Sequence, residues 1–119
     1  MRYSFAVEVG RYLDEVIIAT RRIGQTIEHY FQKYGKVDDY DGKRYLNENQ
    51  FIAGCHELGI DEGHNNYGES LAQRVFYTIA EGEKCLLVES IGNIFFFNSN
   101  VNLEYIETEA LVELHNVLK

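Results

Sequence analysis

The chain has 119 residues and a mass of 13.8 kDa, and 45% of its residues are hydrophobic and 13% aromatic. This composition can fill a hydrophobic core and excludes disordered, collagen-like and low-complexity chains, while the length predicts one domain spanning residues 1–119. The formal net charge of −8 excludes direct nucleic-acid binding through clustered Lys and Arg, and it opposes binding to an anionic membrane.

Apolar residues recur at steps of three and four residues between Phe5 and Tyr34. This spacing is typical of an amphipathic helix. We expect the helix to be continuous from about residue 14 and to end near Gly35. Residues 3–9 leave two interpretations open, because they also fit an alternating strand that is broken at Gly10.

Residues 36–46 predict a loop or a small hairpin around the turn-forming pair Asp41–Gly42. The next segment, from Asn47 to Gln50, matches a capping box, in which the side chains of the two end residues each satisfy a backbone N–H of the other. A short helix should therefore follow, with Phe51 and Cys55 among its buried residues.

The helix that begins at the capping box should end at Gly59, a residue suited to the left-handed conformation after a helix. Asn66 to Glu69 repeats the capping-box pattern. It predicts a second helix that starts there and ends before Gly82, with Leu71, Val75 and Ile79 on its buried face.

The C-terminal part of the chain predicts strands and a last helix. Residues 85–91 and 94–97 fit two strands joined by the two-residue turn Gly92–Asn93, and residues 103–106 fit a third. Thr108 caps a helix that would bury Leu111, Leu114 and Leu118. The predicted fold class is therefore α+β: N-terminal helices, a small antiparallel β-meander in the C-terminal half, and a C-terminal helix.

The two cysteines, Cys55 and Cys85, each lie within an apolar run. They do not form a disulfide scaffold, and we expect both to behave as small hydrophobic residues. The first residues lack the sustained apolar region of a signal peptide, because Glu8 and Arg11 interrupt it, so we expect none; no run is long enough for a membrane span. These features predict a cytoplasmic protein.

Metal and catalytic motifs are absent from the sequence. Cys55, His56 and His64 are zinc-ligand types, but they lack the paired spacing of structural zinc sites, so we predict no metal and no cofactor. Neighbouring helical residues point in different directions, which disfavours a nucleophilic pair of Cys55 and His56. We therefore predict that the chain is not an enzyme. The alternative is a small enzyme or ligand-binding domain that uses His64 with the carboxylates of residues 55–64.

Acidic residues concentrate in the middle of the chain, where residues 38–69 hold eight acidic and two basic side chains. Carboxylates steer and pair with Lys and Arg of a partner, and tyrosines supply anchoring contacts. The alternative is an ordinary solvated loop region. The candidate partner-binding residues are Asp38, Asp39, Tyr40, Asp41, Tyr45, Glu57, Asp61, Glu62 and Tyr67.

Charge and the lack of motifs together predict a small bacterial protein that neutralises a basic protein partner by occlusion. The typical case is an immunity protein or antitoxin that inhibits a nuclease toxin, because nuclease active sites are basic. A nucleic-acid mimic that blocks a DNA-handling enzyme is an alternative. The aromatic run at residues 94–97 leaves a further hypothesis, a homo-oligomer that forms through this predicted strand.

Overall fold

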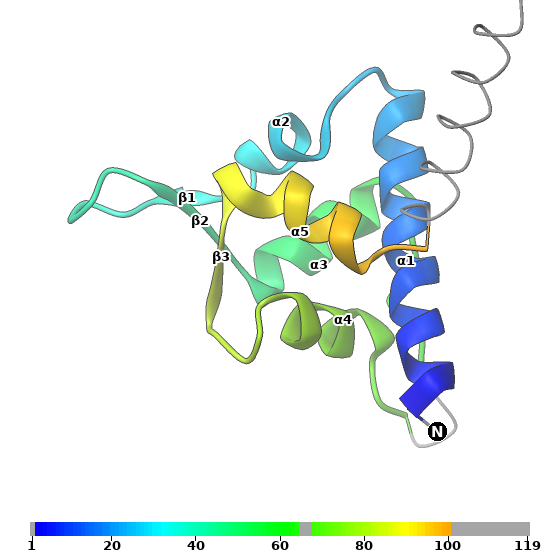
Figure 1. Cartoon of the computed structure of the whole chain (residues 1–119). Coiled ribbons are helices and arrows are strands. Elements are labelled where there is room, and N and C mark those ends of the chain that lie inside the picture. Colours follow the sequence, from blue (N-terminus) through cyan, green and yellow to red (C-terminus); the bar gives the residue numbers. More distant parts are fainter. Residues whose placement is uncertain (1, 65–67, 101–119) are drawn as a thin grey trace, which may run out of the picture.

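The computed structural model describes residues 2–64 and 68–100, with side chains from Val7 onward. The elements combine helices and a sheet, which confirms the α+β class (Figure 1). In chain order they are α1 (Arg2–Arg22), α2 (Ile27–Gln32), β1 (Lys36–Val37), β2 (Arg44–Asn47), α3 (Glu48–Glu57), α4 (Leu71–Ile79), β3 (Cys85–Leu87), the 3₁₀ turn η1 (Val88–Ser90) and α5 (Ile91–Asn98).

The first segment is helical from Arg2, so the strand interpretation of residues 3–9 is wrong. The prediction of one continuous helix to Gly35 is also wrong, because α1 ends at Arg22 and α2 starts after a break. Gly24 causes the break: it has a φ of +72°, a conformation that favours glycine and ends helices. Thr26 then caps α2, with its hydroxyl oxygen accepting a hydrogen bond from the backbone N–H of His29 at 3.0 Å.

The sheet has three antiparallel strands in the order β1–β2–β3. Its first two strands form the hairpin predicted for residues 36–46. The second pairing joins distant parts of the chain, with Leu46 opposite Leu86, and both of these side chains are buried against the core. The sheet therefore links the two halves of the chain and is not a meander of the C-terminal half.

The predicted hairpin of residues 85–91 and 94–97 is wrong, because only Cys85–Leu87 form a strand. The chain then turns through η1 into the helix α5. The physical reason is the spacing of two fully buried side chains: Ile91 and Phe95 are four residues apart and face the core from one side of a helix.

The capping box at Asn47 is confirmed. The Asn47 side chain accepts from the backbone N–H of Gln50, and the Gln50 side chain accepts from the backbone N–H of Asn47, both at 2.8 Å. The second capping box is not formed as predicted, because α4 begins at Leu71 with Ser70 as its N-cap. The Ser70 hydroxyl accepts from the N–H of Gln73 at 3.3 Å.

The core centres on three fully buried rings from three different helices: Phe31 of α2, Phe51 of α3 and Phe95 of α5. Their centroids are 5.8 to 6.0 Å apart, within the range of favourable aromatic pairs. Gly54 lets α2 approach α3 closely, since a Cβ there would lie 2.6 Å from Phe31 Cε1. The Tyr30 hydroxyl donates to the Gly54 carbonyl across the same contact.

The predicted strand 103–106, the predicted C-terminal helix from Thr108 and the candidate residue Tyr67 lie outside the described residues. Within residues 2–64 and 68–100, no helix combines the length and apolar character needed to cross a bilayer.

Candidate functional site

The structure divides the predicted partner-binding residues into two groups. Asp38, Asp39, Tyr40, Asp41 and Tyr45 belong to the β1–β2 hairpin, which projects from the body on the side away from α1 (Figure 1). The other group, Glu57, Asp61 and Glu62, lies at the end of α3 and in the loop after it, which runs back toward α1. One contiguous surface from all of these residues is therefore not formed.

Short hydrogen bonds fix the tip of the hairpin. The backbone N–H of Asp38 donates to the carbonyl of Lys43, and the N–H of Gly42 donates to the carbonyl of Asp38, both at 2.8 Å. A carboxylate oxygen of Asp38 accepts from the N–H of Tyr40 at 2.6 Å. The turn is thus held by its own polar groups and presents Tyr40 in a defined place, where the side chain is 100% exposed.

Asp41 and Tyr45 form a coupled pair at the side of the hairpin. The Tyr45 hydroxyl donates to Asp41 Oδ2, and Asp41 Oδ1 accepts from the N–H of Lys43 at 2.8 Å. The hydrogen bond from Tyr45 is the main cause that lowers the pKa of Asp41, and the hydrogen bond from the Lys43 N–H lowers it further. The same bond raises the pKa of Tyr45 to about 12. Asp41 is therefore a carboxylate, and Tyr45 a neutral phenol, across the physiological pH range.

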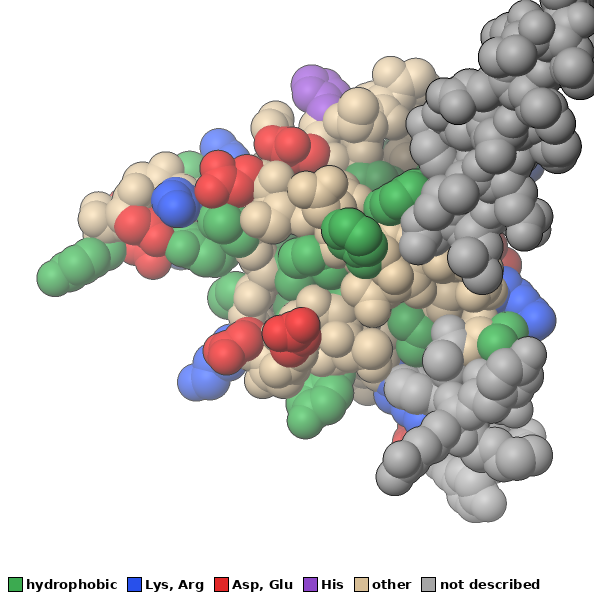
Figure 2. Space-filling view, in the orientation of Figure 1, with side chains coloured by type: hydrophobic (Ala, Val, Ile, Leu, Met, Phe, Trp, Pro, Cys, Tyr) green, Lys and Arg blue, Asp and Glu red, His purple; other side chains and the backbone are tan. Residues whose placement is uncertain are grey.

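The basic residues of the hairpin are turned toward the body of the protein. Lys43 Nζ lies 3.7 Å from Glu89 of η1, and Arg44 Nη1 donates to the carbonyl of Gly35 at 3.1 Å. The carboxylates of Asp38, Asp39 and Asp41 remain exposed around the tip. Residues 38–43 therefore carry three carboxylates and one ammonium group, and Figure 2 shows acidic and basic groups close together along the projection.

The second group of carboxylates is engaged in contacts that support the fold. Glu62 accepts a hydrogen bond from the hydroxyl of Ser70, the N-cap of α4, at 3.0 Å. Glu57 lies 4.0 Å from Lys33, and Asp61 accepts from the N–H of Gly63 at 3.5 Å. Glu62 is thus held by a close hydrogen bond and is half-buried, whereas Glu57 and Asp61 remain exposed.

The cluster at residues 55–64 does not assemble into a nucleophilic or metal site. Cys55 is fully buried, and burial raises the pKa of its thiol to about 12, with a smaller opposing effect from Tyr12. His56 is exposed and lies 4.0 Å from Glu62. No group of three metal-ligating side chains occurs in the part of the chain that the structure describes. Cys85 is exposed, although its apolar run predicted a thiol that behaves as a small hydrophobic residue.

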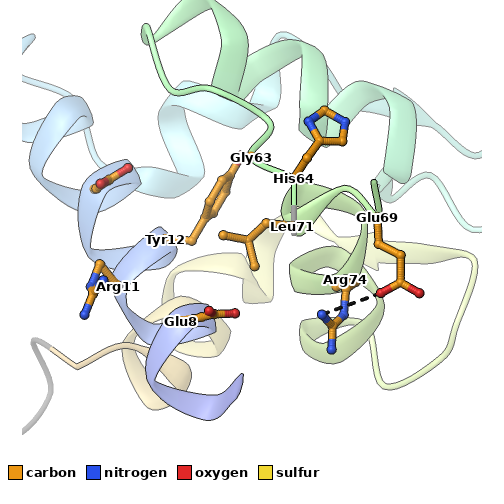
Figure 3. Close-up of a pocket in the computed structure, with 9 residues that line it drawn as sticks. Glu8, Arg11, Tyr12, Gly63, His64, Glu69, Leu71 and Arg74 are labelled. Carbon is orange, nitrogen blue, oxygen red and sulfur yellow. Dashed lines mark ion pairs between the residues drawn. The ribbon is translucent and has the colours of Figure 1, made fainter. Parts of the chain in front are cut away.

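A small cavity lies between α1, the segment at His64 and the start of α4 (Figure 3). Its volume of about 220 Å³ is below the 300 Å³ or more of common ligand pockets. The walls combine both signs of charge, including an Arg74–Glu69 pair at 3.8 Å. Burial is the main cause that raises the pKa of Tyr12, and the neighbouring Cys55 raises it further. The Tyr12 phenol therefore stays neutral. The cavity residues are Glu8, Arg11, Tyr12, Glu15, Gly63, His64, Glu69, Leu71 and Arg74.

Sequence reasoning identified His64 but missed Arg11 and Arg74, two charged residues of this cavity. Arg11 and Arg74 are 63 positions apart in the sequence, and only the packing of α1 against α4 brings their helices together. No local spacing signals such a convergence.

No family model, curated protein or solved structure matches this chain. A functional proposal therefore depends on the surface of the chain. On that surface the acidic hairpin combines projection from the body, an exposed aromatic ring and three carboxylates.

Proposed function

We propose that this chain is a small bacterial cytoplasmic protein that inhibits a basic protein partner by occlusion. The partner would be a nuclease toxin, and the chain its immunity protein or antitoxin. One observation carries the proposal: the projecting β1–β2 hairpin holds a fully exposed Tyr40 among the carboxylates of Asp38, Asp39 and Asp41.

Tyr40 has the properties of an anchor residue for a protein interface. It is a large aromatic side chain that is 100% exposed, and tyrosine is enriched among the residues that dominate binding energy. The hydrogen bonds of Asp38 hold the turn, so little conformational entropy is lost when the tip is buried against a partner. The hairpin tip is therefore suited to docking on a complementary surface.

The charge of the tip defines the chemistry of the partner. A nuclease carries a basic surface because it must bind phosphates. Three carboxylates on a projecting tip and a net charge of −8 speed the encounter with such a surface, to about 10⁸–10⁹ M⁻¹s⁻¹ in steered pairs. Docking beside the nuclease active site then blocks access of the nucleic acid.

Affinity capture with matched variants tests this proposal. The tagged full chain is compared with a hairpin variant, Asp38→Asn/Asp39→Asn/Tyr40→Ala, in lysate of the native host at low and moderate salt. The asparagine side chain that replaces Asp38 retains an acceptor oxygen for the turn. A control variant, Glu15→Gln/Glu83→Gln, also removes two negative charges, but from exposed positions outside the hairpin.

We expect the wild-type chain and the control variant to capture one basic protein in stoichiometric amount, and the hairpin variant to lose it. The captured protein should be a nuclease that the wild-type chain inhibits at a ratio of one to one. A partner retained by the hairpin variant would contradict the role of the hairpin. A captured protein without nuclease activity would contradict the toxin assignment.

Nucleic-acid mimicry is the second candidate, favoured by the three carboxylates that lie within four successive residues of the tip. A mimic occupies the phosphate-binding groove of a DNA-handling enzyme, so duplex DNA should displace it at constant salt. An inhibitor that blocks access of nucleic acid is also displaced by it, so the activity of the captured partner separates the two functions. A nuclease supports the inhibitor, and a DNA-binding enzyme without nuclease activity supports the mimic.

A further inference from the structure

Helix α5 exposes a large aromatic side chain, Phe97, between the exposed Asn93 and Asn98. Ile91 and Phe95 face the core and are fully buried, whereas Phe97 is 74% exposed. Ile94 and Phe96 are half-buried. A surface helix of a globular protein normally presents polar residues to water. Phe97 is therefore an exposed apolar contact point on this helix.

A groove lies beside the exposed Phe97, bounded by the end of α4, by β3 and by α5. Its volume is about 580 Å³, and Leu87, Ile94 and Phe97 are among its lining residues. Hydrophobic side chains gather over α5 on the same face of the molecule (Figure 2). A projecting aromatic ring and a groove that can receive one are thus adjacent.

This surface is nearly neutral in a chain with a net charge of −8. Helix α5 carries no charged residue, and among the described residues that line the groove Glu81 is the one carboxylate. A basic partner gains little electrostatic attraction at such a surface. Two copies of the chain, in contrast, can approach here without bringing many carboxylates together.

Asn100, the last residue that the structure describes, contacts α1. Asn100 Nδ2 donates to the Val7 carbonyl of α1 at 3.3 Å, and a Cβ at Gly10 would collide with the Asn100 side chain, 2.3 Å from its Oδ1. Asn100 is therefore held on α1, beyond the end of α5 that is remote from β3 (Figure 1). The groove faces β3 and α4 instead.

We propose that a second copy of this chain covers the outer face of α5, with Phe97 of each copy seated in the groove of the other. Because the ring and the groove lie side by side on one copy, a two-fold axis can place each ring in the groove of the other copy. Such a contact closes as a dimer and does not continue into a filament. Twelve residues line the groove, fewer than the 20–30 per side of a standard interface. The dimer is therefore weak and depends on concentration.

The salt dependence of this contact has the opposite sign to that of the hairpin. Two chains of charge −8 repel one another, and salt screens that repulsion. Added salt therefore strengthens the dimer, whereas it weakens the complex between the acidic hairpin and a basic partner. The dimer does not depend on the proposed inhibitor function, and either can fail alone.

Analytical ultracentrifugation of the full chain tests the dimer, at concentrations from about 10 μM to about 1 mM that bracket weak association. Three chains are compared: wild type, Phe97→Glu and the control Tyr77→Glu. Tyr77 is also largely exposed, at 69%, and does not line this groove. Both substitutions replace an exposed aromatic ring, so neither should unfold the protein.

We expect the wild type and Tyr77→Glu to dimerise increasingly with concentration and with salt. Phe97→Glu should weaken association more than about tenfold, as expected for an anchor residue. Cys85 is exposed and lines the groove, so its labelling by a thiol reagent should slow as the concentration rises.

The proposal would be overturned by a wild type that stays monomeric throughout, by an undiminished Phe97→Glu dimer, or by an equal loss of association in Tyr77→Glu. Slow Cys85 labelling in a monomer at every concentration would also overturn it, and would show that residues 101–119 cover the groove.

Discussion

Lys43 Nζ lies 3.7 Å from Glu89 Oε1, and this ion pair connects the projecting hairpin to the turn that precedes α5. The pair draws the positive charge nearest to the tip back toward the body. It leaves the carboxylates of Asp38 and Asp39 at the outer end. The acidity of the tip therefore depends on a residue that is 46 positions away in the sequence.

Glu89→Gln should release the hairpin without weakening the fold. Both partners of the pair are more than half exposed, and exposed ion pairs contribute about 0–1 kcal/mol. We expect a change below about 0.5 kcal/mol in the free energy of unfolding, and faster amide hydrogen exchange of residues 38–43. Glu83→Gln is the control. Equal exchange in both variants would show that the ion pair does not restrain the hairpin.

Two glycine-to-alanine substitutions should have opposite signs. In Gly54→Ala the new Cβ would lie 2.6 Å from Phe31 Cε1, and overpacking of a core costs about 1–3 kcal/mol. In Gly92→Ala the new Cβ meets nothing within 4 Å, and a helical alanine is favoured over glycine by about 0.5–1 kcal/mol. Chemical denaturation measures both changes. Stabilisation by Gly54→Ala would contradict the close approach of α2 and α3.

Asn47→Ala should destabilise the protein by about 0.5–2 kcal/mol, the usual effect of losing an N-cap. The substitution removes the acceptor for the Gln50 N–H, which is bound at 2.8 Å. Asn49→Ala, at an exposed position in the same helix turn, serves as the control and should be close to neutral. The free energy of unfolding from urea titration gives the comparison. Equal losses would show that the capping box contributes nothing specific.

Tyr45 should ionise at higher pH than an ordinary tyrosine, because its hydroxyl donates to Asp41 and its pKa is raised from 10.0 to about 12. A raised pKa contributes stability that is fully present below about pH 10 and is lost as the pH rises through about 12. Asp41→Asn should lower the Tyr45 pKa toward 10, and Asp39→Asn should not. Phenolate absorbance, with Tyr45→Phe as the reference, measures the difference. An unshifted Tyr45 pKa in Asp41→Asn would contradict the coupling.

The two thiols should react at very different rates. Cys85 is exposed, whereas Cys55 is fully buried and burial raises its pKa to about 12. Since the thiolate is the reactive form, we expect one fast equivalent with a thiol reagent in native protein and a second after unfolding. Cys85→Ser should remove the fast equivalent. A fast equivalent that survives in Cys85→Ser would contradict the buried position of Cys55.

Features that depend on neighbouring residues were predictable. The hairpin at Asp41–Gly42 and the capping box at Asn47 need only residues within a few positions of each other. The acidic tip was predictable for the same reason, since its five candidate residues lie between positions 38 and 45. Local hydrogen bonds and turn preferences decide these features before any tertiary contact forms.

Features that depend on distant contacts were not predictable. The aromatic run at residues 94–97 fits a strand or a helix by itself. It is helical because Phe95 packs against the buried rings of α2 and α3 while Ile91, four positions earlier, is buried on the same side of the helix. The pairing of Leu46 with Leu86 spans 40 positions, and no spacing rule selects that strand partner.

The sequence alone determined the α+β class, the acidic hairpin and the buried thiol of Cys55. These features depend on hydrophobic periodicity and on charge, which are set by residues close together in the sequence. Tertiary structure decided that Glu57, Asp61 and Glu62 lie apart from the hairpin and that Phe97 is exposed beside a groove. The physical reason is that burial of one face of each helix fixes the directions of all its other side chains. Which face is buried depends on the packing of the whole core.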